Sequence, residues 1–170
     1  MLKLAGCLLI VASSVYAALS HIKSLRKRAQ GITAMVELLS AMKIKINYEF
    51  TSLPELLKSL RLNSTYPISL FLDECVMNLN QGENLKSAWK KSVDRFSDKM
   101  NLTQGDINIL SEFSLSLGDS DVGGQISNIQ LYTEMLRKNL SDAESIIKDK
   151  SRITLSCSLF GGLIFLVLLI

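Results

Sequence analysis

The stretch that decides the fold is VGGQISNIQLYTEMLRKNLSDAESII, residues 122–147. Apolar side chains recur in it every three or four residues for about seven turns, the spacing of one face of an α-helix. These residues are Ile126, Ile129, Tyr132, Leu136, Leu140, Ala143 and Ile147. No proline or glycine follows before the uncharged segment that begins at Ile153. The pattern is compatible with one long helix that continues into that segment, but the sequence leaves open whether the helix is unbroken.

The middle of the chain shows the same helical spacing elsewhere. In residues 31–48 the repeating apolar residues are Ile32, Met35, Leu39, Met42 and Ile46. Strand-like alternation of apolar and polar residues is absent. The pattern predicts an all-α fold, a helical bundle with short connections.

The expected helix boundaries follow from prolines, caps and one glycine. SLPE, residues 52–55, has the pattern of a capping box, with Pro54 in the first turn of a helix that ends near Leu62. A second helix starts near Pro67. TQGD, residues 103–106, caps a third helix, which Gly118 ends.

Both ends of the chain are apolar. Residues 4–20 and 153–170 contain no charged side chain, and an 18-residue helix is about 27 Å long, close to the thickness of a bilayer core. We expect transmembrane anchors at residues 1–22 and 153–170, around a domain of residues 23–152.

Basic residues lie just inside both anchors. They are Lys23, Arg26, Lys27 and Arg28 after the first, and Lys148, Lys150 and Arg152 before the second. The positive-inside rule then puts the middle domain in the cytoplasm. The alternative is a signal peptide cleaved after Ala17, which would leave a secreted or extracytoplasmic helical binding module with a C-terminal tail anchor. The single Lys3 ahead of the first segment disfavours it, because signal peptides carry their positive charge at that end.

The charge distribution argues against nucleic-acid binding. The whole chain has a net charge of +3, but residues 29–147 contain 11 basic and 15 acidic side chains. The basic excess therefore belongs to the two membrane boundaries, and the expected domain is mildly acidic.

Catalytic and metal-binding patterns are missing from the sequence. The one histidine is His21, and the three cysteines, Cys7, Cys75 and Cys157, have no metal-site spacing. We expect no enzymatic activity, no cofactor, no metal and no small-molecule substrate.

One polar loop stands out. GDSD, residues 118–121, follows an expected helix and precedes another. The favoured interpretation is that Asp119, Ser120 or Asp121 caps the next helix, where a carboxylate also suits the helix dipole. A binding surface is compatible with this role, whereas two carboxylates alone are a weak cation site.

Three stretches carry a resemblance to a known family: MKIKINYEFTSLPELLKSL (42–60), GENLKSAW (82–89) and LGDSDVGGQISNI (117–129). Together with the two anchors they resemble the stage III sporulation protein AB family. The most specific positions are Leu117, Gly118, Ser120, Asp121 and Gln125, together with the Y-x-x-T-x-L-P-E pattern of residues 48–55. The family's usual aromatic residue and LG pair near the second anchor are replaced in KDKSRITLSCSLFGG, residues 148–162.

The resemblance implies a component of the sporulation channel between mother cell and forespore. The family is similar to the cytoplasmic domain of F-type platform proteins in type II secretion and type IV pilus systems. By that likeness, the domain would dock a hexameric ATPase, stage III sporulation protein AA, while the anchors join the membrane lipid and other membrane components of the channel. The interaction candidates are Gly118, Asp119, Ser120, Asp121 and Gln125.

Overall fold

The computed structural model describes the backbone of residues 2–48, 52–119 and 121–169, and within these ranges the side chains of residues 13, 16, 17 and 19–150. The described residues form α-helices and no strand, which confirms the all-α prediction for this part of the chain. The helices are α1 (Leu2–Tyr48), α2 (Leu53–Leu62), α3 (Ile68–Asn80), α4 (Leu85–Met100), α5 (Gln104–Ser116) and α6 (Val122–Leu169).

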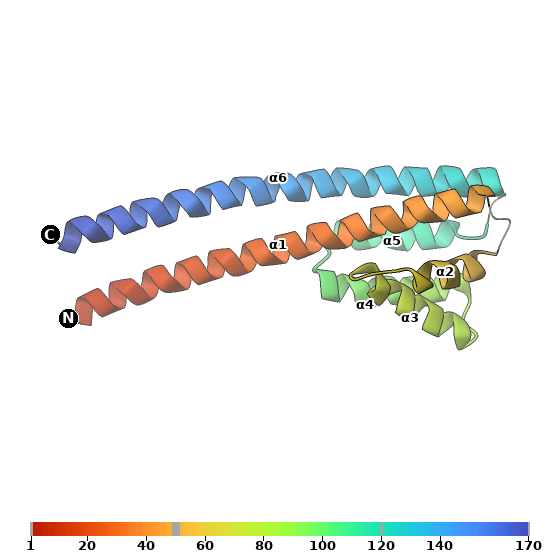
Figure 1. Ribbon diagram of the computed structural model, residues 1–170, viewed down its shortest axis with the longest axis horizontal. Helices are drawn as coiled ribbons and strands as arrows, with labels where there is room; N and C mark the ends of the chain where they lie inside the picture. The colour runs from red at the N-terminus through yellow and green to blue at the C-terminus, as the bar shows by residue number, and fades with distance from the viewer. Residues whose placement is uncertain (1, 49–51, 120, 170) are drawn as a thin grey trace.

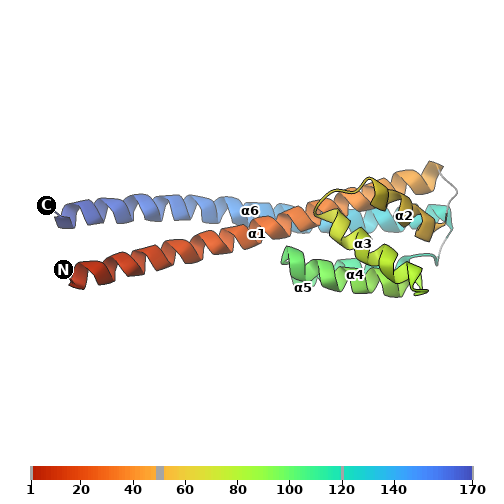
Figure 2. The ribbon, with the colours of Figure 1, turned by 60° about the horizontal axis from the view of Figure 1, so that its bottom comes forward.

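Helices α1 and α6 form a long antiparallel hairpin (Figures 1 and 2). Both chain termini lie at one end of it, here called the terminal end, and α2–α5 pack against the other half, towards the distal end. Lys43 Nζ donates to Gln130 Oε1 at 3.1 Å near the distal end, and Lys150 Nζ contacts His21 Nε2 towards the terminal end. The sequence left open whether the last helix continues beyond residue 152; in the structure α6 runs from Val122 to Leu169 without a break.

The predicted apolar faces form the core. Ile32, Met35, Leu39, Met42 and Ile46 of α1 are all buried, as are Ile129, Leu136 and Ala143 of α6. The other four residues predicted for the α6 face are half-buried: Ile126, Tyr132, Leu140 and Ile147. The helical period therefore identified the inward face of α1 in full and that of α6 in its central residues.

Aromatic rings join the short helices to the hairpin. Trp89 of α4 packs edge-on against Phe71 of α3 and Phe113 of α5, with ring centroids 4.7 and 5.1 Å away. Phe113 in turn lies 5.5 Å from Tyr132 of α6. The indole Nε1 of Trp89 donates to the carbonyl of Leu110 at 3.1 Å, so its one polar group is satisfied. The expected role of Trp89 as a core residue is confirmed, since it is fully buried.

The helix starts agree with the expected positions, but one cap differs. The capping box at Thr103 and Asp106 is present, and the backbone N–H of Thr103 donates to Asp106 at 2.9 Å. At α2, Ser52 occupies the N-cap position without a side-chain bond to the backbone. Its hydroxyl instead donates to the Glu55 carboxylate at 2.9 Å, so the capping box predicted there does not form.

A buried ion pair ties α5 to the hairpin. Asp106 is fully buried and accepts from Arg28 of α1, with Nε–Oδ2 and Nη2–Oδ1 distances of 2.7 and 3.1 Å. Asn139 of α6 donates to the same carboxylate at 2.8 Å. Arg28 was expected to belong with the basic residues of the membrane boundary. Its guanidinium points into the bundle instead, because the Asp106 carboxylate offers it a bidentate partner there.

Helix α1 also approaches the end of α4 closely, one turn after Arg28. A Cβ atom on Gly31 of α1 would lie 2.7 Å from the Cβ of Met100, at the end of α4. The absence of a side chain at residue 31 therefore lets α1 and α4 touch.

The two predicted anchors fall largely where side chains are not described. All of residues 153–170, and most of residues 1–22, lie outside the described side chains. Within the part that is described, none of the helices combines the length and apolar character needed to cross a membrane.

Candidate docking surface

The connection between α5 and α6 lies at the distal end and contains most of the predicted interaction residues. Gly118 has a φ of +79°, a left-handed conformation that glycine adopts without strain, and it turns the chain after α5. Asp121 Oδ1 accepts from the backbone N–H of Gly124 at 2.9 Å, which caps α6. The capping interpretation is thus confirmed for Asp121, while Ser120 lies outside the described residues.

Asp119 has a different role from Asp121. Its side chain is 62% exposed, and its carboxylate forms an ion pair with Lys86 of α4 at 2.6 Å. An exposed ion pair of this kind contributes little to stability. Asp119 is therefore available for contact with another molecule at little cost to the fold.

A hollow of about 650 Å³, here called the loop hollow, adjoins this connection. Its lining comes from the starts of α2, α4 and α6 and from the end of α5: Leu53, Pro54, Asn84, Leu85, Lys86, Leu117, Gly118 and Gln125. The structure thus brings Gly118 and Gln125 together with Leu53 and Pro54, which lie more than 60 residues earlier in the chain. Both sequence stretches that carry the most specific resemblance meet in this one hollow.

Local bonds hold the start of α4 beside the loop hollow. Asn84 caps the helix, since its Oδ1 accepts from the backbone N–H of Ser87 at 2.8 Å. Glu83 accepts from the Ser87 hydroxyl and pairs with Lys91. The hydrogen bonds from Lys91 and Ser87 hold the pKa of Glu83 below its usual range.

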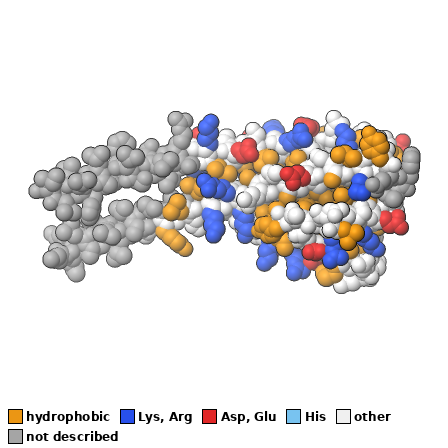
Figure 3. Space-filling model, in the orientation of Figure 1, with side chains coloured by type: hydrophobic (Ala, Val, Ile, Leu, Met, Phe, Trp, Pro, Cys, Tyr) orange, Lys and Arg blue, Asp and Glu red, His pale blue; other side chains and the backbone are white. Residues whose placement is uncertain are grey.

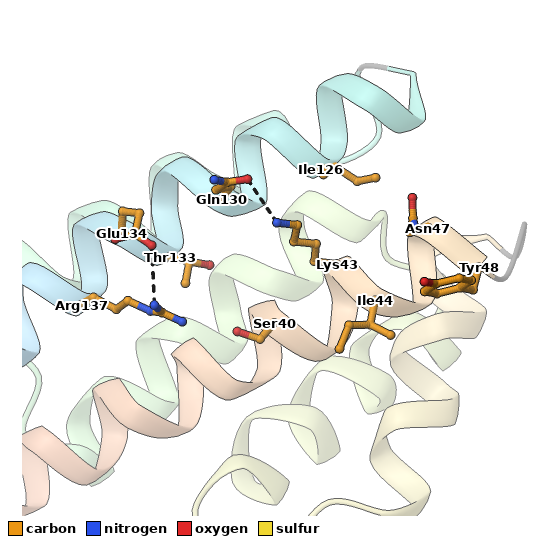
Figure 4. Close-up of a pocket in the computed structure, with 10 residues that line it drawn as sticks. All are labelled: Ser40, Lys43, Ile44, Asn47, Tyr48, Ile126, Gln130, Thr133, Glu134 and Arg137. Carbon is orange, nitrogen blue, oxygen red and sulfur yellow. Dashed lines mark hydrogen bonds and ion pairs between the residues drawn. The ribbon is translucent and has the colours of Figure 1, made fainter.

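A second hollow, here called the α1–α6 groove, lies between the last turns of α1 and the first turns of α6 (Figure 4). It has a volume of about 500 Å³, and Lys43 reaches across it to Gln130. Arg137 and Glu134 of α6 lie at one end, with 3.7 Å between Nη1 and Oε1. Ile44 and Tyr48 line the α1 side and are 61% and 76% exposed.

Further exposed apolar side chains occur at the distal end. Val122 begins α6, and Leu115 lies in the last turn of α5; both are exposed. Together with Ile44 and Tyr48 they give this end several large apolar side chains in contact with solvent. Beside the two hollows, these side chains make the distal end the candidate surface for binding another protein.

Groups suited to chemistry are not gathered at this surface. Among the described side chains, no three of the types histidine, cysteine, aspartate and glutamate are close enough to hold a metal ion. The fold thus defines an all-helical module. Its candidate docking surface, here called the distal surface, comprises the loop hollow, the α1–α6 groove and the exposed Leu115 and Val122.

Comparison with known proteins gives the family. Residues 3–170 match the family described as stage III sporulation protein AB. The chain is 25% identical over 170 residues to stage III sporulation protein AB of Bacillus subtilis (strain 168), covering 99% of both chains. A solved structure of stage III sporulation protein AB has the same fold, with a TM-score of 0.64 and 24% identity over 72% of this chain and 97% of that one. The chain therefore belongs to the stage III sporulation protein AB family, which confirms the predicted resemblance.

Sequence reasoning missed several residues of this surface. Asn84, Leu85 and Lys86 line the loop hollow, and Lys43 spans the α1–α6 groove. The N-cap pattern at Asn84 was a usable signal for the start of α4. The α1–α6 groove had no such signal, because it forms only when helix α1 packs against helix α6.

Proposed function

We propose that this chain is a non-enzymatic, membrane-anchored platform of the sporulation channel between mother cell and forespore. Its bundle faces the mother-cell cytoplasm and docks a secretion-type ATPase, stage III sporulation protein AA, through the distal surface. The anchors hold the platform in the mother-cell membrane beside the other membrane components of the channel. Membership of a sporulation protein family supports the cellular process.

One observation carries the proposal: the two apolar segments begin at the same end of one helical hairpin (Figure 1). If both segments cross a bilayer, the α2–α5 side of the hairpin lies on a single side of it. The distal surface is then the part of the bundle farthest from the membrane. A partner in the cytoplasm can reach it without meeting the bilayer.

The continuity of α1 favours a retained first segment over a cleaved signal peptide. α1 runs without a break from Leu2 to Tyr48, and Ile22 is already buried in the hairpin. Cleavage after Ala17 would remove the first part of this helix. The secreted module remains the competing outcome of the topology test below.

The topology test relies on Cys75, a buried cysteine that should not react with the labelling reagent. Cys75 is fully buried, and burial raises the pKa of its thiol to about 11, although a hydrogen bond with Ser92 opposes this shift. Because the thiolate is the reactive form, Cys75 should resist maleimide in the folded chain and react only after denaturation.

With Cys7 and Cys157 replaced by alanine, we introduce Ser141→Cys, at an exposed position of α6. A membrane-impermeant maleimide should label this cysteine only after the cells are permeabilised. Labelling in intact cells, with a mature protein that begins at Ala18, would support the secreted module and overturn the platform.

The docking test changes charge at the α5–α6 connection while keeping the cap. Asp119→Lys combined with Asp121→Asn shifts the local charge by +3, and asparagine caps a helix about as well as aspartate. We expect the affinity for the purified ATPase to fall by about tenfold or more, as is typical when a close interfacial charge pair is broken. The affinity can be measured by surface plasmon resonance, with the chain immobilised and the ATPase titrated over it.

The matched control makes the same change on α4. Asp94→Lys with Asp98→Asn alters two exposed aspartates of that helix by the same total charge. This variant should bind the ATPase as the wild-type chain does. Equal affinities for wild type and the Asp119/Asp121 variant would remove the α5–α6 connection from the docking surface.

A further inference from the structure

Basic side chains gather at the terminal end of the described hairpin. Lys23, Arg26 and Lys27 of α1 and Lys148 and Lys150 of α6 are exposed or half-buried there. In residues 19–27 and 146–150 the one acidic residue is Asp149. In Figure 3, blue side chains lie next to the grey terminal segments.

Two of these cations lie on the same face of the hairpin as the α1–α6 groove. Arg26 precedes Ile44 by 18 residues, and Lys148 follows Gln130 by 18 residues. Eighteen residues are five full turns of an α-helix, so each pair shares one side of its helix. Ile44 and Gln130 both line the groove (Figure 4). Arg26 and Lys148 therefore lie on the same face of the hairpin as the groove, but towards its terminal end.

The contact between His21 and Lys150 keeps the two helices adjacent at this level. Because the helices are antiparallel, that contact sets residue 23 of α1 level with about residue 148 of α6. Arg26 and Lys148 then lie within about one helical turn of each other along the hairpin.

Several cations elsewhere on the bundle are paired, whereas Lys58 and Lys90, used as controls below, are exposed cations without an ion pair to the described side chains and lie on α2 and α4, away from the terminal end. Arg28, Lys86, Lys91 and Arg95 each pair with a carboxylate. Within the described part of the chain, Lys23, Arg26, Lys27 and Lys148 have neither an ion pair nor a hydrogen bond to their side chains. Their charges are therefore available to an anion from outside the protein.

We propose that Arg26 and Lys148, with Lys23 beside them, bind the phosphate of an anionic phospholipid headgroup. This assignment rests on the membrane anchoring proposed above. A guanidinium can bond two phosphate oxygens at once, and a lysine adds a flexible second cation.

The apolar residues next to this site suit the acyl region of a lipid rather than a free anion. Leu19 precedes Arg26 by seven residues, so it lies on the same face two turns away, within the uncharged segment of residues 4–20. Leu19 and Tyr16 are both exposed. Tyrosine and apolar side chains at this level, followed by basic ones, match the order of groups met on leaving a bilayer.

The test counts lipids bound to the full chain in neutral detergent. Dioleoyl phosphatidylglycerol or dioleoyl phosphatidylcholine is added, and the lipids retained are counted by native mass spectrometry. We expect the wild-type chain to retain phosphatidylglycerol about tenfold better, a preference that anionic headgroups confer on basic sites. Arg26→Gln with Lys148→Gln should lose that preference, whereas Arg26→Lys with Lys148→Arg should keep it.

The control variant, Lys58→Gln with Lys90→Gln, loses two exposed cations elsewhere on the bundle. It should retain phosphatidylglycerol as well as the wild-type chain does. An equal loss in both double glutamine variants would overturn the site, because net charge alone would then explain retention. Displacement of the lipid by millimolar inorganic phosphate would overturn its assignment to a lipid.

Alkaline extraction of membranes separates the two proposals. If the wild-type chain stays in the membrane but shows no preference for phosphatidylglycerol, the headgroup site fails and the platform stands. If the chain is released by alkali, membrane anchoring fails, and the headgroup site fails with it.

Discussion

Replacing Asp106 with alanine is expected to lower the free energy of unfolding by about 3–5 kcal/mol, as when one partner of a buried ion pair is removed. The Asp106 side chain is 0% exposed and that of Arg28 is 12% exposed. Without the carboxylate, the Arg28 charge would remain inside the bundle with no partner at that position. Asn139 would lose its acceptor, and α5 would lose its capping box.

Urea unfolding of the full chain in detergent micelles, followed by circular dichroism, measures this loss. Asp94→Ala is the matched control, because Asp94 is an exposed aspartate of α4. That control should change the free energy of unfolding by less than about 0.5 kcal/mol. If the Asp106→Ala variant were as stable as the control, the ion pair would not be what holds α5 to the α1–α6 hairpin.

The pH dependence of the free energy of unfolding should also report the contribution of the ionised Asp106 carboxylate. Burial pushes the pKa of Asp106 upward, but the hydrogen bonds from Arg28, Thr103 and Asn139 together outweigh it and hold the pKa below its usual range. The ionised carboxylate therefore contributes stability above the unfolded pKa of about 3.9, and this contribution is lost as the pH falls through the lower folded pKa. The stability difference between wild type and Asp106→Asn should narrow on acidification below about pH 4.

Local sequence pattern was sufficient for the helices but not for their pairing. The recurrence of Ile32, Met35 and Leu39 reports a buried face, because residues three and four apart lie on one side of a helix. It does not say what covers that face. The pairing of α1 with α6 depends on contacts between the two ends of the chain, for which no short-range rule exists.

The Asp106 cluster illustrates the same limit. Asp106 was readable as part of a capping box, since that motif is local. Arg28 lies 78 residues away, in a run of basic residues that pattern alone assigns to a membrane boundary. Only the fold distinguishes this arginine, which turns inward, from Arg26, which stays exposed.

The candidate surface was predictable in part for a related reason. Asp121 was recognisable as a cap because the loop lies next to the helix that it caps. The meeting of Gly118 and Gln125 with Leu53 and Pro54 was not, because it requires α2 and α6 to start at the same end of the bundle. The two stretches that carry the family resemblance are therefore far apart in the sequence but adjacent in the fold.

Trp89→Ala should lower the free energy of unfolding by about 3–5 kcal/mol, the usual cost of deleting a buried aromatic side chain. Trp89 is the one tryptophan of the chain, is fully buried, and touches rings from both α3 and α5. Its loss would leave a cavity where α3, α4 and α5 meet, because the surrounding rings can relax only in part. Circular dichroism in urea measures the variant, while the wild-type chain can also be followed by its single indole fluorescence.

Trp89→Phe separates the role of the ring from that of the indole N–H. It keeps an aromatic side chain in the cluster but loses the hydrogen bond to the Leu110 carbonyl, so its cost should be about 1–2 kcal/mol. Trp89 lies one turn after Lys86, and its packing helps to hold the start of α4 beside the loop hollow. ATPase binding should therefore survive in Trp89→Phe under conditions where the variant is folded. If Trp89→Ala were as stable as Trp89→Phe, the cluster would not be the element that fixes α4 in place.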